Sequence, residues 1–396
     1  MPHAIALALE TLSTLLAVAS IAYFFAAIFA ALLYLRERRQ PRAHFAPGVS
    51  VLKSLKGLDP GMLDAFRTHC RQNYAGEYEL IFGVADASDP AISAVKQLQM
   101  EFPEHAIRLL VCPERLGTNG KISTLMQMEP EAQYEYLLIN DSDIDVSPEY
   151  LARVMSCFAP EAGKKPVGLV TALYRGRAHG TLGSRIESLG ISTDFQAGVL
   201  LSKMIEGGLH YGLGSTLAVD RNALHAAGGL GALVDQLADD YEMGARIDKV
   251  GYSVALCTDV VETAIPAYRW QEFIDHQLRW LRTVRDSRPG GYFGMIFMHG
   301  FAWALLNVIA SGLSPLSLGL LALSFVVRIS MAMLVGACVL QDRQVVASLP
   351  LLPLRDLVQM VLWVAGFAGN TIVWRGQRFE LKNGKLVNRE VSKSKS

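Results

Sequence analysis

The sequence predicts an α/β domain that apolar helices at both ends attach to a membrane. Strand-like apolar runs alternate with helical stretches between residues 36 and 292, and long uncharged segments lie on either side of that region. A third observation concerns chemistry, because two acidic clusters and an Arg-Trp pair are spaced across the polar region. They are Asp141-Ser142-Asp143, Asp239-Asp240 and the stretch His276 to Trp280.

The N-terminal segment is the first expected membrane span. The chain carries no charge from Thr11 to Leu35, which is long enough for a helix to cross a hydrocarbon core of about 30 Å. Its positive charges follow the apolar stretch, whereas a cleaved signal peptide would have them in front. The positive-inside rule then places the next residues in the cytosol. We therefore expect an anchor over residues 1–35 and a cytosolic domain over 36–292.

The C-terminal part predicts a transmembrane region over residues 293–375, followed by a basic tail over 376–396. Arg328 falls within this region at a cost of about 2.5 to 3.5 kcal/mol, so it should face protein, lie near an interface or snorkel. The expected spans are roughly 293 to 313, 316 to 340 and 357 to 374. Three such spans would leave the tail outside, although its Lys and Arg residues favour the cytosol. Either one segment is re-entrant or the tail departs from the rule.

Composition excludes several classes of protein. The chain has 37 basic and 37 acidic residues, so nothing supports bulk electrostatic binding to nucleic acid. Its five cysteines form no Cys-x-x-Cys pair. They fit buried small hydrophobic residues in a reducing cytosol better than a disulfide or zinc framework.

The middle region predicts a mostly parallel sheet with acidic residues at one edge. Asp86 follows the second strand-like run and Asp141 to Asp145 follow the fourth, and neighbouring parallel strands would bring these acids to the same edge. The runs are Val49 to Leu52, Glu79 to Val84, Ile107 to Val111, Tyr136 to Ile139 and Val167 to Ala172.

Short motifs are distributed along nearly the whole chain. In order, they are Pro47 to Gly57, Asp86 to Ala91, Asn119 to Ser123, Asp141-Ser142, Gly214 to Thr216, Gly228-Gly229, Ala238 to Tyr241 and Arg279-Trp280. This ordered set resembles the ceramide glucosyltransferase family. The resemblance implies a GT-A fold, an inverting reaction, a UDP-sugar donor and a lipid acceptor. Bacterial enzymes that glycosylate hopanoid lipids are similar too.

The resemblance assigns the first acidic cluster to the donor. A diphosphate leaving group gains negative charge that a hard divalent cation on a carboxylate would neutralise, so we expect Asp143 to bind Mg²⁺ or Mn²⁺ with Asp141 beside it. The alternative is a solvated acidic loop. Asp86 would accept the uracil N–H, unless it is only a turn-forming aspartate. Lys121 would bring a cation to the uridine or the diphosphate.

The second acidic cluster supplies the expected general base. Asp240 would take the proton of the acceptor hydroxyl as the new bond forms. The competing interpretation is favourable charge in the first turn of a helix expected over Tyr241 to Lys249. The family usually has Glu-Asp here, so Asp239 is expected to contact substrate in a less defined role.

The Arg-Trp pair lies in an expected helix over Gln271 to Arg285. Arg279 would pair with the diphosphate and Trp280 would wall the acceptor channel, or both would belong to an ordinary interfacial helix. His276 stands where many related synthases have Gln or Arg. A lone histidine is more often a structural hydrogen-bonding residue than a base.

These observations favour an enzyme that transfers a hexose from a UDP-sugar, with UDP-glucose expected, to a lipid hydroxyl. The alternative is a hopanoid glycosyltransferase that uses UDP-N-acetylglucosamine. A processive polysaccharide synthase fits less well because the C-terminal spans are few and position 276 is not Gln. A non-catalytic scaffold would have no reason to retain Asp86, Asp143, Asp240 and Arg279 together. The expected location is a multi-pass protein of a bacterial inner membrane.

Overall fold

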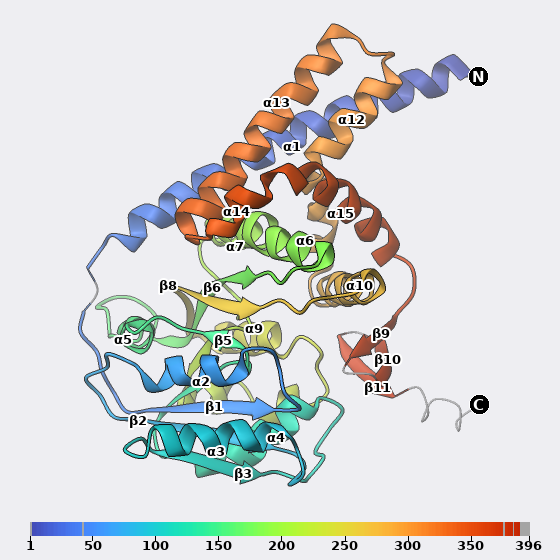
Figure 1. Cartoon of the computed structure of the whole chain (residues 1–396). Helices are drawn as coiled ribbons and strands as arrows, with labels where there is room; N and C mark the ends of the chain where they lie inside the picture. The colour runs from blue at the N-terminus through green and yellow to red at the C-terminus, as the bar shows by residue number, and fades with distance from the viewer. Residues whose placement is uncertain (1, 42, 375–376, 383, 389–396) are drawn as a thin grey trace. The chain divides into compact units, whose positions relative to one another are not determined.

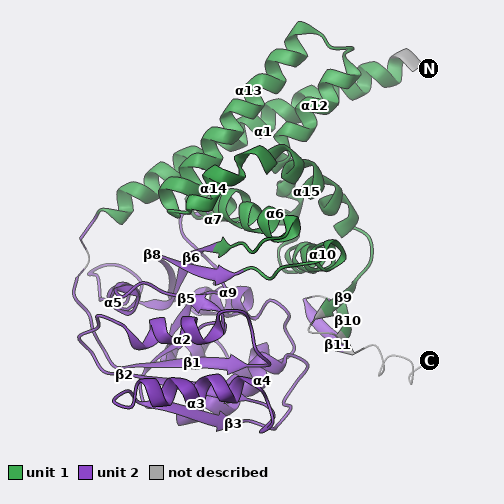
Figure 2. Cartoon of the chain, viewed as in Figure 1, with its two compact units in different colours: residues 1–39, 176–205, 265–381 green, residues 40–175, 206–264, 382–396 purple. Residues whose placement is uncertain are grey.

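The computed structural model describes residues 2–41, 43–374, 377–382 and 384–388, and the chain forms two compact units (Figure 2). The helical unit comprises residues 1–39, 176–205 and 265–381, and the sheet unit comprises 40–175, 206–264 and 382–396. The expected domain limits at 35, 292 and 375 remain predictions, because both compact units are discontinuous in sequence. Residues 389–396 of the expected basic tail lie outside the described residues.

The sheet unit is built on a mixed sheet in which eight described strands follow the order β3-β2-β1-β4-β7-β6-β8-β5 (Figure 1). The strands β3, β2, β1 and β4 run parallel, so their carboxyl ends share one edge. Their bounds are β1 Val49–Leu55, β2 Tyr78–Val84, β3 Ile107–Val111 and β4 Tyr136–Ile139, and the fifth predicted run lies in β6 Val167–Arg177. All five predicted strands are therefore present.

The expectation of a mostly parallel sheet was wrong. The strand β7 (Leu217–Asp220) runs antiparallel to β4 and β6, and β5 (Ile144–Asp145) runs antiparallel to β8 (Ser253–Ala264). Both β7 and β8 come from a part of the sequence where no strand was predicted. The fold class itself, a mixed α/β domain, is confirmed.

Two helices of the sheet unit, α4 and α8, begin where polar side chains cap them. Asn119 accepts a hydrogen bond from the Ile122 N–H at the start of α4, and Asp220 accepts from the Asn222 and Ala223 N–H groups at the start of α8. The helices are α2 Met62–Cys70, α3 Ala91–Glu101, α4 Gly120–Met128, α5 Tyr150–Ser156, α8 Arg221–Ala226 and α9 Asp239–Lys249. A short strand, β11 (Lys385–Asn388), lies against this unit through the Leu386 N–H, which donates to the Asp235 carbonyl.

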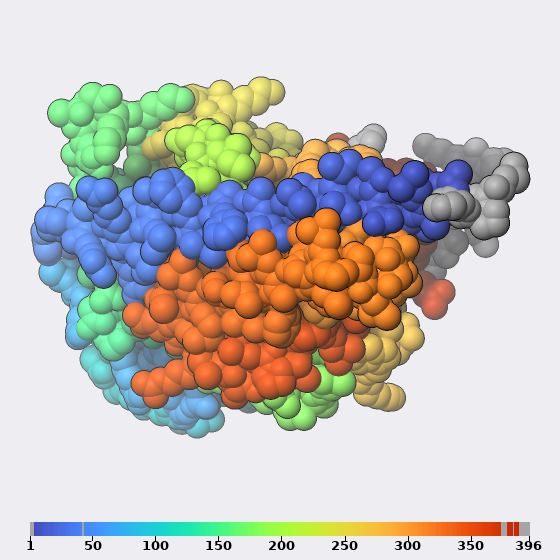
Figure 3. Space-filling model, turned by 90° about the horizontal axis from the view of Figure 1, so that it is seen from above, coloured from blue at the N-terminus to red at the C-terminus, as the bar shows by residue number. Residues whose placement is uncertain are grey.

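The helical unit is organised around the long helix α1 (Pro2–Arg38), which packs lengthwise against α12 (Gly300–Ala310) and α13 (Pro315–Ala332) (Figure 3). Asn307 Nδ2 ties the end of α12 to the Glu10 carbonyl and to Thr14 Oγ1, at 3.1 and 2.7 Å. The remaining elements are α6 Leu182–Gly190, the π-helix η2 Ile191–Phe195, α7 Gln196–Ile205, α10 Trp270–Ser287, α11 Pro289–Gly294, the π-helix η5 Met333–Val339, α14 Arg343–Ser348, α15 Leu352–Gly366, β9 Thr371–Trp374 and β10 Gln377–Lys382.

Among the described residues, three helices are long and apolar enough to cross a membrane: Ala4–Arg38, Pro315–Val339 and Arg343–Gly366. A further pair, Pro289–Met298 and Gly300–Ala310, would make one span but bends by 55° between its halves. The first two helices match expected spans, whereas the limits 357 to 374 were wrong. The helix ends at Gly366, where the Arg285 side chain donates to the Gly366 carbonyl at 2.8 Å, and β9 follows.

Arg328 is fully buried in the helical unit, as expected for a charge in a span that faces protein. Its guanidinium donates to Asp356 at 2.9 and 3.1 Å and to Asp194 Oδ1 at 2.6 Å, and Arg355 pairs with Asp194 Oδ2 at 2.8 Å. These four side chains form a formally neutral ionic cluster. Four of the five cysteines are buried, as expected, whereas Cys338 is exposed.

Candidate active site

The acidic loop after β4 is held in place at three points in the sheet unit. One bond reaches its main chain and two reach its side chains. Lys53 Nζ donates to the Asp141 carbonyl at 2.9 Å, Ser142 Oγ donates to Asp59 Oδ2 at 2.5 Å, and Thr263 Oγ1 donates to Asp143 Oδ2 at 2.5 Å. The loop is therefore fixed from β1, from the segment before α2 and from β8.

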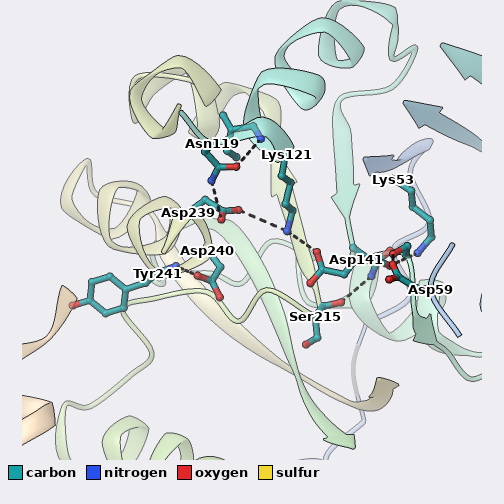
Figure 4. Close-up of polar contacts among 12 residues, drawn as sticks. Lys53, Asp59, Asn119, Lys121, Asp141, Ser215, Asp239, Asp240 and Tyr241 are labelled. Atoms are coloured by element: carbon teal, nitrogen blue, oxygen red, sulfur yellow. Dashed lines mark hydrogen bonds and ion pairs between the residues drawn. The ribbon is translucent and has the colours of Figure 1, made fainter. Parts of the chain in front are cut away.

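Lys121 joins the two acidic clusters (Figure 4). Its ammonium donates to Asp141 Oδ1 at 2.7 Å and lies 3.7 Å from Asp239 Oδ2. Asn119, which caps the same helix α4, donates to Asp239 Oδ1 at 3.4 Å. Burial lowers the pKa of Lys121, but the carboxylates of Asp141 and Asp239 raise it by more, so the net direction is upward. Lys121 thus remains a cation between two carboxylates that are far apart in sequence.

Asp240 lies in the first turn of α9 with one oxygen tied to the backbone. Its Oδ1 accepts the Tyr241 N–H at 2.8 Å, while Gly214 faces Oδ2 so closely that a Cβ there would come within 3.1 Å. Burial and the neighbouring charge of Asp239 raise the pKa of Asp240 to about 6. At neutral pH its carboxylate is therefore ionised and able to accept a proton.

Two further polar groups of the sheet unit, the Ser215 hydroxyl and the Lys53 ammonium, lie at the candidate site. The first could bind a ligand, and the second holds the acidic loop. The Ser215 hydroxyl is buried and has no hydrogen-bond partner among the described residues. Lys53 is fully buried, and burial lowers its pKa to about 7 against the opposing effect of Asp143 and Asp141. Sequence reasoning missed Lys53, Asp59 and Thr263. Lys53 alone had a signal in the sequence, because it is a single lysine directly after the apolar run of a predicted strand.

Asp86 follows β2 at the same sheet edge, and its exposed carboxylate makes a local turn. Its Oδ1 accepts from the Ser88 N–H at 2.8 Å and from the Ser88 hydroxyl at 2.7 Å, and these bonds lower the pKa of Asp86. Within the described part of the chain, no contact links Asp86 to Asp141 or Lys121. The turn interpretation therefore describes its geometry, and a role toward uracil stays a prediction.

The acidic loop fits a cation that arrives together with a diphosphate. Among the described residues, no group of three or more His, Cys, Asp or Glu side chains is arranged to hold a metal. Asp143 and Asp141 nevertheless offer hard oxygen donors, and Mg²⁺ in phosphate chemistry is commonly held by only one or two carboxylates, with phosphate oxygens and waters completing the shell. Burial and the charge of Asp141 raise the pKa of Asp143, a cost that a bound cation would offset.

The Arg-Trp motif belongs to the helical unit and is described there by itself. It lies on α10, which confirms the expected helix. Arg279 and Trp280 are consecutive in this helix, and the Trp280 ring contacts Phe195 with centroids 5.4 Å apart. One turn earlier, His276 and Gln277 both bind Glu187, a buried residue of α6 that sequence reasoning missed.

Comparison with known proteins identifies the family of this chain. The model for glycosyl transferase family 21 matches residues 12–387. Ceramide glucosyltransferase 3 of Caenorhabditis elegans is 25% identical over 252 residues, which cover 60% of this chain and 50% of that protein. The ceramide glucosyltransferase of Komagataella phaffii is 29% identical over 110 residues, which cover 27% of this chain and 21% of that enzyme. The chain thus spans about half the length of the first relative, and less of the second.

Among solved structures, the mannosyltransferase PcManGT of Pyrobaculum calidifontis, in complex with GDP-Man and Mn²⁺, is similar with a TM-score of 0.52. The two chains share 17% identity, and the likeness covers 91% of this chain and 99% of the other. At that identity the likeness concerns the fold, which is that of nucleotide-sugar transferases. Since the family model matches nearly the whole sequence, the chain belongs to glycosyl transferase family 21 and is a glycosyltransferase related to the ceramide glucosyltransferases.

Proposed function

We propose that this glycosyltransferase moves a hexose from a UDP-sugar, UDP-glucose in the first place, to the hydroxyl of a membrane lipid with inversion at the anomeric carbon. The observation that carries the proposal is the contact of Lys121 with Asp141 and Asp239. Through this lysine, the first acidic cluster lies close to the second cluster, which contains Asp240. The names of the similar enzymes support glucose as the sugar and ceramide as the acceptor.

Asp240 performs the proton transfer in this proposal. The acceptor oxygen attacks the anomeric carbon, the bond from that carbon to the diphosphate oxygen breaks, and Asp240 takes the hydroxyl proton. The free oxygen Oδ2 suits this step, because Oδ1 is already bonded to the Tyr241 N–H. Attack from the face opposite the leaving diphosphate gives inversion.

The donor is held by charge on both sides of the leaving group. Asp143 would hold Mg²⁺ or Mn²⁺ with Asp141 beside it, and such a cation neutralises the charge that develops on a leaving diphosphate. The Lys121 ammonium supplies a second positive charge in addition to the metal ion. Lys53 fixes the main chain of the acidic loop at Asp141. Asp86 accepts the uracil N–H.

On the acceptor side, the proposal assigns Arg279 to the diphosphate and Trp280 to the wall of the acceptor channel. The aromatic contact between Trp280 and Phe195 supports an apolar wall at this place in the helical unit.

The test is an assay of product. The purified chain in lipid nanodiscs would be incubated with UDP-glucose or UDP-N-acetylglucosamine and with ceramide or a hopanoid polyol, and the lipids analysed by mass spectrometry. We expect hexosylceramide from UDP-glucose, lost in Asp240→Asn and retained in Glu242→Gln, which removes an acid from the same helical turn. Product from UDP-N-acetylglucosamine and the hopanoid alone would favour the alternative, and no lipid product from any pairing would overturn the proposal.

The proposal also places the sheet unit and the C-terminal tail in the cytosol. Arg38, at the end of α1, donates to the Val339 carbonyl at the end of η5 at 3.0 Å, while Asn307 contacts the start of α1. α12 and α13 therefore form a hairpin. Its turn lies near the N-terminal end of α1, and the residues that follow α13 lie near the C-terminal end of α1. If α1 enters the cytosol, so does the chain after Val339.

The last apolar helix, Arg343–Gly366, then lies along the cytosolic side instead of crossing. It is long and apolar enough for a span, but it buries Arg355, Asp356 and Gln359. It also packs against α10, which carries charges along its whole length. A helix of this kind leaves the basic tail in the cytosol and removes the conflict that three C-terminal spans create.

Cysteine labelling tests this topology. In a Cys338→Ser background the remaining cysteines are buried, so an added cysteine dominates labelling by an impermeant maleimide. Exposed Ala162 reports on the sheet unit and exposed Leu313 on the turn between α12 and α13. Leu313→Cys should be labelled in intact cells and Ala162→Cys only after lysis. The reverse pattern would invert the orientation.

A further inference from the structure

A buried carboxylate lies beneath the Arg-Trp helix. Glu187 belongs to α6, and its side chain is only 2% exposed. Its Oε2 lies 3.1 Å from His276 Nδ1 and 3.1 Å from Gln277 Nε2. One carboxylate oxygen therefore accepts hydrogen bonds from two consecutive residues of α10. The imidazole nitrogen that faces a carboxylate carries the hydrogen, which leaves Nε2 as the acceptor nitrogen of the neutral ring.

The second ring nitrogen of His276, Nε2, makes no hydrogen bond among the described residues. The side chain is 22% exposed. The ring stacks on Tyr268 with centroids 5.4 Å apart and faces Trp280 at 6.0 Å. His276 is thus a polar acceptor set between two aromatic rings.

A histidine with a purely structural role has a different pattern in this chain. His69 is buried, with Nδ1 3.0 Å from the Ala65 carbonyl and Nε2 3.2 Å from Asn140 Oδ1. Both of its nitrogens thus lie within hydrogen-bond distance of protein oxygens inside the sheet unit. At His276 only Nδ1 has a protein partner, and Nε2 has none among the described residues.

We propose that His276 binds an uncharged hydroxyl of the lipid acceptor's head group through Nε2, with Glu187 as the positioning residue that fixes the imidazole tautomer. The proposal rests on the proposed function, which places Trp280 beside the acceptor. A hydroxyl donates to Nε2, whereas a phosphate or carboxylate has no proton to donate and would meet the negative field of Glu187. Glu187 and His276 therefore select neutral, hydroxylated head groups.

Two substitutions of His276 separate the roles of its nitrogens. His276→Asn keeps a donor near the Nδ1 position for Glu187 but removes the group at Nε2, whereas His276→Gln keeps a polar group near Nε2. The dissociation constant of a fluorescent ceramide would be measured in nanodiscs without donor, beside the UDP-glucose KM. One lost hydrogen bond predicts about a 3- to 10-fold weaker ceramide affinity for His276→Asn. His276→Gln should stay nearer to wild type, and the UDP-glucose KM should change less than twofold in both.

A double-mutant cycle tests whether Glu187 acts through His276. Glu187→Gln allows the other tautomer and should weaken ceramide binding in the wild-type background, but it should change it less than twofold in the His276→Asn background. An equal effect of Glu187→Gln in both backgrounds would overturn the proposal, as would equal ceramide affinities of His276→Asn and His276→Gln. Thermal midpoints identify variants that merely misfold, and His276→Gln then supplies the comparison.

Failure of this inference is distinguishable from failure of the proposed function. A wild-type chain that binds ceramide through His276 but transfers no sugar would refute the function and leave the site. If the chain transfers sugar but its ceramide affinity is unchanged by His276→Asn, His276→Gln and Glu187→Gln, the proposed site is refuted and the proposed function stands. A wild-type chain that binds no ceramide refutes the site as stated.

Discussion

The charge state of Asp240 predicts how the reaction depends on pH. Burial and Asp239 raise its pKa from 3.8 to about 6, so the base is lost as the pH falls through that value. At pH 5, roughly one Asp240 side chain in eleven would be ionised, and the rate should fall to about a tenth of its plateau. An aspartate with its ordinary pKa would keep most of its activity there.

Replacing Asp240 by Asn separates this effect from substrate binding. General-base catalysis contributes about 10²- to 10⁴-fold, so the rate should fall by that order while the affinity for the UDP-sugar changes little. Stability should not fall with it. A carboxyl whose folded pKa is raised adds stability below its unfolded pKa, and that stability is lost as the pH rises through about 6. Above that pH, Asn removes an unfavourable buried charge, and the thermal midpoint should be equal or higher.

Initial rates would be measured at saturating donor from pH 4.5 to 8.5 for the wild type and for Glu242→Gln as a control. We expect an acid limb with an apparent pKa near 6 in both enzymes. A flat profile across this range, or an Asp240→Asn enzyme with near wild-type turnover, would refute Asp240 as the base. Asp239 would then be the next residue to replace.

Three further predictions follow from particular contacts. Removal of divalent cations with EDTA should abolish transfer, and Mn²⁺ or Mg²⁺ should restore it in the wild type but poorly in Asp143→Asn; full activity in chelator would contradict the assignment of Asp143. Gly214→Ala would bring a Cβ within 3.1 Å of Asp240 Oδ2, so turnover should fall about tenfold or more with the UDP-sugar KM little changed. Arg328→Met leaves two buried carboxylates with one arginine and should lower the free energy of unfolding by about 3 to 5 kcal/mol, measured by thermal inactivation in detergent, whereas Val326→Met at an exposed site of the same helix should have little effect.

The parallel half of the sheet could be predicted because each of its strands is a compact apolar run. Tyr136 to Ile139 has the same limits in sequence and structure. The strands β7 and β8 could not, because β7 contains alanine and aspartate, which are depleted in strands, and β8 is only partly buried along its length. Their partners lie far away in the chain, and no local pattern specifies a strand direction.

The acids of the site could be predicted through the family resemblance, but the residues that hold them could not. A lysine inside a strand favours an exposed edge, yet Lys53 is buried because the Asp141 carbonyl and nearby carboxylates receive its ammonium. Glu187 precedes His276 by many residues, and only the packing of α6 against α10 brings them together. Such contacts depend on tertiary structure and leave no periodic signal.

The ionic cluster around Arg328 has a consequence for how the chain is made. Arg328 is neutralised by Asp194, which precedes it in the sequence, and by Asp356, which follows it. While the protein is being synthesised, α13 is complete before Asp356 has been translated, so half of its compensating charge does not yet exist. Arg328 therefore acquires its full set of charge partners only after α15 has been translated and has docked against α13.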